Sequence, residues 1–322
     1  MIVRWSLAEL PSVLADLGVE RPLVLATPRW AGLVGAVPAA GRWSEVPSER
    51  IGEALGAAPH ADGVLVVGGG SAIDLGKAIS AAGRLLLVSV PTTYAGAEWT
   101  TYFGVRDPQR RMRGGGGGAH PTAIVYEPQL TLELPPETTV GTAMNALAHC
   151  AEALYVQGHN EEADAHALAG AELIGAWLPV VVEAPHDLDA RTSLLRGACH
   201  AGAALAGSNL ALAHAMAQAV GGRYGLPHGT LNGICLPPVL RFNADVVPDA
   251  VRRFGDAIVA PDPASRSEEL AALAGPTRLR ELGVPEADLP ELAASAAGRG
   301  GNRANPRPAS PDEIESLLRS VH

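Results

Sequence analysis

The sequence predicts a fold of two parts, an α/β domain followed by an all-α domain. In the first 135 residues, short continuous apolar runs alternate with helical patterns. After that point the chain is rich in alanine, and its apolar residues recur three and four positions apart. Strands buried between two layers of helices have such continuous apolar runs. We therefore expect residues 1–135 to form the α/β domain and residues 136–322 to form the helical domain.

Each strand of the expected parallel sheet corresponds to one apolar run. The runs are PLVLAT, GVLVVGGG, RLLLVSVPTT and TAIVYEP, at residues 22–27, 63–70, 84–93 and 122–128. No strand-like run occurs between residues 140 and 240, and prolines separate short helical patterns from Asp262 onward. Five consecutive glycines, Gly114–Gly118, interrupt the first domain. Because glycine runs are costly to order, we expect a mobile loop there, either a linker or a lid.

Composition excludes several classes of protein. The 322 residues carry a net charge of −10, which argues against nucleic-acid binding, and the basic stretch Arg106–Arg113 is expected to be a solvated loop. Three cysteines without close pairs predict neither disulfides nor a zinc cluster, and they suit a reducing compartment. The chain has no leader pattern and no apolar stretch of ~20 residues. We therefore expect a cytoplasmic protein that does not enter a membrane.

The second apolar run ends in glycines that suit a phosphate group. At Gly69 and Gly70 the backbone N–H groups can approach a pyrophosphate, and Ser71 is expected to cap the next helix and donate to phosphate. Asp74 is expected to form a capping-box contact or to hydrogen bond with nicotinamide or ribose. This turn matches neither the GxGxxG fingerprint nor the Walker A motif. A chain reversal without a ligand is therefore the alternative interpretation.

The third apolar run favours the phosphate interpretation. It ends in Thr92 and Thr93, which are followed by small residues. The carboxyl ends of parallel strands meet at one edge of a sheet, where ligands of open α/β domains bind. We therefore predict that the first domain binds a dinucleotide.

A second cluster of polar residues occurs in the helical part. Asn145, His149 and Glu152 are four and three positions apart, which places them on one helix face. His214 and His228 follow, and they can meet if the chain reverses at Gly221–Gly222. Three imidazoles and an oxygen ligand are typical of a divalent-metal site, although most histidines in proteins are structural or exposed.

Taken together, these motifs resemble the iron-containing alcohol dehydrogenase superfamily, and within it the maleylacetate reductases. GGGSAIDLGKA at residues 68–78 is similar to the family's GGGSxxDxAKA, and PTTYAGAEWT at residues 91–100 to its PTTYAGSE. MNALAHCAEALY at residues 144–155 is similar to MNAxAHxxEALY of the maleylacetate reductases. GGRYGLPHG, LPPVLRFN and NPRPAS follow in the family's order.

The resemblance implies a dehydroquinate synthase-like fold, with an N-terminal domain that binds NADPH or NADH and a C-terminal helical domain that holds the catalytic residues. It implies a homodimer that acts on a small-molecule substrate. Gly69, Gly70, Ser71, Asp74, Thr92, Thr93 and Arg111 would hold the cofactor, Arg111 in place of a lysine near the nicotinamide ribose. Asn145, His149, His214, Gln218 and His228 would form the catalytic set.

Metal dependence is left open by the resemblance. Metal-dependent relatives ligate with an aspartate and three histidines, which correspond here to Asn145, His149, His214 and His228. Maleylacetate reductases carry asparagine at the first of these positions and generally do not require metal. The amide removes a charge and a strong oxygen donor, but three histidines still suffice for zinc or iron.

The chain departs from the maleylacetate reductases at two places. Gln218 stands where the superfamily has a histidine near the substrate, and glutamine donates no proton at neutral pH. The glycine run replaces an arginine-containing stretch. We expect hydride transfer to an activated alkene or carbonyl of a small carboxylated substrate. The alternatives are a metal-dependent alcohol dehydrogenase or aldehyde reductase, and a nucleotide-binding homologue without redox activity or with a non-redox reaction.

Cofactor preference is partly readable at the end of the first apolar run. NAD-specific relatives often place an acidic residue there for the ribose diol. Here the run ends in Ala26, Thr27 and Pro28, followed by Arg29. Without a carboxylate and with an arginine nearby, a 2′-phosphate is tolerated. We therefore expect NADPH to be accepted at least as well as NADH.

Overall fold

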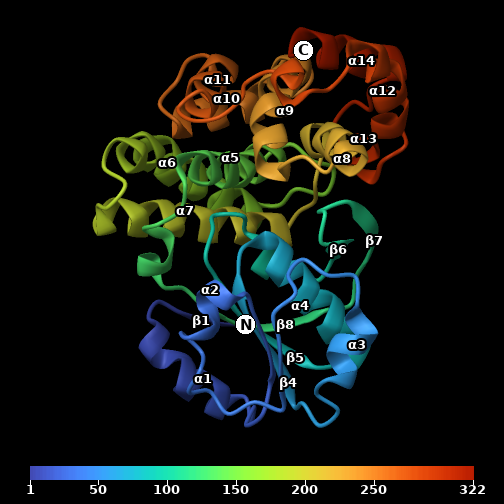
Figure 1. Ribbon diagram of the computed structural model, residues 1–322. Helices are drawn as coiled ribbons and strands as arrows, with labels where there is room; N and C mark the ends of the chain where they lie inside the picture. Colours follow the sequence, from blue (N-terminus) through green and yellow to red (C-terminus); the bar gives the residue numbers. More distant parts are fainter. The chain divides into compact units, whose positions relative to one another are not determined.

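A computed structural model describes residues 1–322 and divides them into two compact units. The first, called the α/β unit here, consists of Met1–Thr93 and Ala97–Thr131. The second, the helical unit, consists of Tyr94–Gly96 and Leu132–His322. The tripeptide Tyr94–Gly96 thus packs with the helical unit, although the chain around it belongs to the α/β unit. Figure 1 shows both units coloured along the sequence.

The α/β unit contains a parallel six-stranded sheet in the order β1-β8-β5-β4-β2-β3. Its strands are β1 Ile2–Arg4, β2 Leu23–Ala26, β3 Gly41–Trp43, β4 Gly63–Gly68, β5 Leu86–Pro91 and β8 His120–Val125. Its helices are α1 Leu10–Asp16, α2 Pro28–Ala31, α3 Ile51–Gly56 and α4 Gly70–Gly83. The four predicted strands are confirmed as β2, β4, β5 and β8. The sequence missed β1 and β3, because they are three-residue edge strands that are only partly buried.

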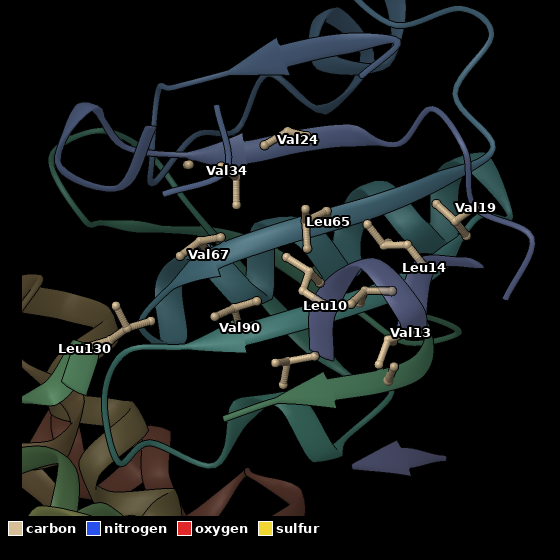
Figure 2. Packing of buried hydrophobic residues seen from close by; sticks show 14 residues of the cluster. Leu10, Val13, Leu14, Val19, Val24, Val34, Leu65, Val67, Val90 and Leu130 are labelled. Carbon is tan, nitrogen blue, oxygen red and sulfur yellow. The ribbon is translucent and has the colours of Figure 1, made fainter. Parts of the chain in front are cut away.

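Helices cover both faces of the sheet, as the continuous apolar runs predicted. Val24 and Leu65 point to the face that α1 covers with Leu10 and Val13, as Figure 2 shows, and Val88 belongs to the same core cluster. Their chain neighbours, such as Leu23, Val64 and Leu87, point to the other face and pack against α3 and α4. Alternate residues of the inner strands are therefore buried on opposite sides of the sheet.

The expectation of a glycine loop is wrong for three of the five glycines, while Gly117 and Gly118 lie in a loop. Gly114–Gly116 belong to β7 (Met112–Gly116), which pairs antiparallel with β6 (Phe103–Arg106). Glycine hides strands from sequence analysis because it has no side chain to show an alternating pattern. Here the lack of a side chain matters, since a Cβ on Gly115 would lie 2.9 Å from the Phe103 carbonyl oxygen.

The helical unit consists of ten helices, which confirms the all-α prediction. They are α5 Pro136–Ala153, α6 Glu161–Glu183, α7 Leu188–Ala206, α8 Leu212–Tyr224, α9 His228–Asn243, α10 Pro248–Ala257, α11 Pro263–Ala271, α12 Leu289–Ala297, α13 Gly300–Ala304 and α14 Pro311–Ser320. The prolines after Asp262 begin α11 and α14, where a missing N–H does no harm.

One helix passes a length and composition test for a membrane span, although the sequence contains no continuous apolar run of ~20 residues. By length and composition, α6 is apolar and long enough to cross a membrane, because its alanines, leucines and valines outweigh its few charges. In the helical unit α6 packs against α5 and α7. Its Asp164 forms an ion pair with Arg253 of α10 at 2.7 Å. Such contacts are typical of a core helix.

Lys77 connects α4 to the segment that follows β5. It is the only lysine of the chain, which has 24 basic residues, and its side chain is buried. Its ammonium group donates to the carbonyl oxygens of Ala97 and Tyr102 at 2.7 Å each and to the Thr100 hydroxyl at 3.0 Å. It also pairs with Asp74 at 2.9 Å. A compact ammonium with several donors satisfies this cluster, whereas a planar guanidinium would not fit it.

We predict that Lys77→Met lowers the free energy of unfolding by about 3 kcal/mol, because it leaves buried oxygens and Asp74 without their cation. Urea denaturation measures this change. The matched control is Arg84→Met at the exposed end of the same helix, with an expected effect within about 0.5 kcal/mol. Equal stability of Lys77→Met and the wild type would contradict the assigned role of Lys77.

Candidate active site

The glycine turn lies between β4 and α4, at the edge of the sheet where β5 also ends. Gly69 is the N-cap of α4, and a Cβ there would lie 2.8 Å from a methyl carbon of Thr93. The expected Ser71 cap is wrong, because the helix begins at Gly70 and Ser71 lies inside its first turn. The cap position carries no side-chain hydrogen bond, so the start of the helix is open to an anion.

The remaining predicted cofactor residues lie at different distances from this turn. Thr92 is buried, and its N–H donates to the Gly68 carbonyl at 3.1 Å. Asp74 forms no capping box; instead its carboxylate accepts from the Gly104 N–H at 3.2 Å and pairs with Lys77. Arg111 is exposed in the turn between β6 and β7. The structure therefore brings together Gly69, Gly70, Ser71 and Thr93 at the turn, whereas Arg111 lies on the β6–β7 hairpin.

The second cluster lies in the helical unit and joins α5, α8 and the start of α9. The rings of His149 and His214 stack, with centroids 4.7 Å apart and planes 13° apart. The His228 ring lies 5.7 Å from that of His214. The chain reverses at Gly225, with φ +70°, and not at Gly221–Gly222 as expected. Gly221 lies inside α8, and α9 packs closely against it, with a Leu231 methyl 3.1 Å from where a Cβ would be.

Glu152 of α5 holds the His214 ring by a hydrogen bond. Its carboxylate is fully buried and accepts from His214 Nδ1 at 2.7 Å. It also accepts from the backbone N–H groups of Ala211 at 2.6 Å and His214 at 3.2 Å, at the beginning of α8. The positive end of the helix dipole stabilises the carboxylate there. These bonds place the proton of His214 on Nδ1 and leave Nε2 buried without a partner.

His149 presents a second buried nitrogen without a partner. Its Nε2 lies 3.4 Å from Asn145 Nδ2, and its Nδ1 has no hydrogen-bond partner. Burial lowers the pKa of His149 well below its usual value, and the neighbouring His214 and His228 lower it further. His149 is therefore neutral at neutral pH.

The amide of Asn145 is held on both sides. Its Nδ2 donates to the Ala95 carbonyl at 2.9 Å, and its Oδ1 accepts from Asn232 Nδ2 at 2.6 Å. The same Asn232 nitrogen lies 3.1 Å from His228 Nε2, so Asn232 links the two. Sequence reasoning missed Asn232, although its place four residues after His228 on one helix was a usable signal.

Gln218 lies one helical turn beyond His214 on α8. It is partly exposed, and no hydrogen bond involves its side chain. An amide at this position can donate to or accept from a ligand, but it cannot supply a proton.

These side chains do not fit a metal ion as they lie. No group of three or more His, Cys, Asp or Glu side chains among residues 1–322 is arranged to hold one. The lone pairs of an imidazole lie in the ring plane, and the nearly parallel planes of His149 and His214 do not meet at one point. Asn145 Oδ1 is already engaged by Asn232. The possible metal set of Asn145, His149, His214 and His228 is therefore not formed.

Comparison with known proteins agrees with this architecture over the whole chain. Residues 2–128 match the family "Iron-containing alcohol dehydrogenase", and residues 139–322 match "Fe-containing alcohol dehydrogenase family, C-terminal". The maleylacetate reductase of Pseudomonas knackmussii is 36% identical in an alignment of length 330 that covers 98% of this chain and 93% of the relative.

Solved structures show the same similarity. The crystal structure of maleylacetate reductase from Agrobacterium tumefaciens has a TM-score of 0.89 at 32% identity, covering 99% of this chain and 95% of that one. The maleylacetate reductase from a Rhizobium species has a TM-score of 0.89 at 31% identity, with the same coverage. The chain belongs to the iron-containing alcohol dehydrogenase family and is an NAD(P)-dependent oxidoreductase similar to maleylacetate reductases.

Proposed function

We propose that the protein is an NAD(P)H-dependent reductase that acts on an activated alkene or carbonyl of a small carboxylated substrate, as a maleylacetate reductase does. One observation carries this proposal: two stacked imidazoles each keep a buried nitrogen without a partner, and they do not converge on a metal. Buried polar atoms are costly to leave unsatisfied, so their clustering favours a polar ligand at this place.

The glycine turn is the proposed cofactor site. Gly69, Gly70 and Ser71 would hold the pyrophosphate at the start of α4, with Thr93 beside them. When bound there, NAD(P)H supplies the hydride. Asp74, one turn along α4, and Arg111, on the β6–β7 hairpin, are the proposed contacts with nicotinamide and ribose.

His149 and His214 are the proposed groups that polarise the substrate. Addition of a hydride to a conjugated alkene leaves negative charge on the carbonyl oxygen, and donors stabilise that charge. Because His149 accepts weakly at Nε2, its Nδ1 carries a proton and is such a donor. His214, whose Nδ1 proton is held by Glu152, is the proposed group that takes up a solvent proton at Nε2 and passes that proton to the adjacent carbon, while the Glu152 carboxylate balances the imidazolium charge. His228 and Asn145 assist by shaping this cluster.

The direct test is oxidation of NADPH at 340 nm with maleylacetate, before and after removal of metal by a chelator. We expect turnover to persist within about twofold, because no step depends on a metal. Near-stoichiometric zinc or iron in the purified protein, with activity lost on chelation, would instead favour a metal-dependent alcohol dehydrogenase. Tight NADPH binding without turnover of any enoate or carbonyl would favour the homologue without redox activity, which Gln218 motivates.

We predict that kcat/KM with NADPH is at least equal to that with NADH. No carboxylate follows β2, and α2 begins there at Pro28 with Arg29 next to it. Arg29→Ala should lower kcat/KM for NADPH about tenfold and leave NADH nearly unchanged, since only NADPH carries the 2′-phosphate. Steady-state kinetics with both cofactors measure this. A strong preference of the wild type for NADH would refute it.

A further inference from the structure

Arg299 carries a guanidinium group without a partner. It lies between α12 and α13 and is only partly exposed. Its side chain makes no hydrogen bond or ion pair, and its Nε is buried and unsatisfied. Burial lowers the pKa of Arg299, and no nearby carboxylate offsets this effect. A guanidinium stays charged in proteins, so a partly buried one without an anion favours an anionic ligand.

Arg191 shows how a buried guanidinium is otherwise satisfied in this protein. Arg191 is also buried without a carboxylate, but oxygen atoms surround it. It donates to the carbonyl oxygens of Pro185 and Leu132 and to the hydroxyl groups of Tyr94 and Thr139. Arg191 is therefore satisfied by the fold itself, whereas Arg299 is not.

The Arg299 guanidinium lies over the helix that carries His214. A Cβ on Gly222 would be 3.9 Å from its Nη2. Gly222 follows Gln218 by four residues and His214 by eight, so these residues share one side of α8. At a rise of 1.5 Å per residue, Gln218 and His214 lie roughly 6 and 12 Å from Gly222 along the helix axis.

Three polar groups without partners therefore follow one another along α8. They are His214 Nε2, the Gln218 amide and the Arg299 guanidinium. Gly222, the residue of α8 beside the guanidinium, adds no side chain to this row. A ligand with a reactive carbon at one end and an anion at the other would match the row.

We propose that Arg299 binds the carboxylate of the substrate that is remote from the reacting carbon, with the Gln218 amide as a second donor. A guanidinium fork pairs with a carboxylate through two parallel hydrogen bonds. This inference rests on the proposed function and names the residue that would hold the carboxylate remote from the reacting carbon. It also gives Gln218 a binding role in place of the proton transfer that glutamine cannot perform.

The test compares Arg299→Gln, Arg299→Lys and the control Arg303→Gln. Arg303 lies four residues further on, is exposed, and donates to the Gly298 carbonyl. With maleylacetate, Arg299→Gln should raise KM roughly tenfold to hundredfold while kcat changes less than threefold. The KM of Arg299→Lys should lie between those of Arg299→Gln and the wild type, and the KM of Arg303→Gln should equal that of the wild type. An unchanged KM in Arg299→Gln, or an equal loss in Arg303→Gln, would overturn the proposal.

Binding of adipate, a dicarboxylate that cannot be reduced, separates this inference from the proposed function. In calorimetry, adipate should bind the wild type and Arg303→Gln, and at least tenfold more weakly Arg299→Gln, whether or not any substrate turns over. NADPH affinity should be equal in all variants, which shows that they are folded. Equal adipate affinity in the wild type and Arg299→Gln would refute the role of Arg299 even if the reductase activity is real.

Discussion

The candidate site depends on one buried carboxylate. Glu152 is fully buried on α5 and accepts three hydrogen bonds from the first turn of α8, one of them from the His214 ring. This clamp joins two helices that are far apart in sequence and orients His214. The stacked His149 and the neighbouring His228 then follow from the position of His214. Without the carboxylate, the His214 ring would lose the hydrogen bond that orients it and the negative charge that balances its protonated form.

Around the Glu152–His214 hydrogen bond, the polar neighbours of the histidines are the amides of Asn145 and Asn232, where a metal site would need charged ligands. Asn232 bridges Asn145 and His228, and Asn145 in turn holds the carbonyl of Ala95. Neutral groups that satisfy one another cost less to bury than charged ones. The result is a polar cluster whose geometry is set by hydrogen bonds within the helical unit, with unpartnered atoms only at His149, His214 and Asn232.

The features that follow a repeating pattern along the chain were predictable from the sequence. The features that depend on contacts between distant residues were not. Apolar runs predicted the inner strands, because burial on both faces leaves a continuous pattern. The edge strands and the glycine-rich β7 have no such pattern. The residues Asn145, His149, His214 and His228 were identified from motifs, but the Glu152–His214 bond joins residues 62 positions apart. The open guanidinium of Arg299 is likewise visible only when the fold brings it to α8.

The kcat of Glu152→Gln isolates the role of the buried carboxylate, because glutamine keeps the shape of the side chain and removes its charge. We expect kcat to fall by about a hundredfold or more, since His214 loses the group that orients its ring and balances its charge. NADPH affinity, measured by fluorescence titration, should stay unchanged, because the glycine turn belongs to the other unit. A kcat within about threefold of the wild type would contradict the assignment of Glu152 and His214 as the centre of the site.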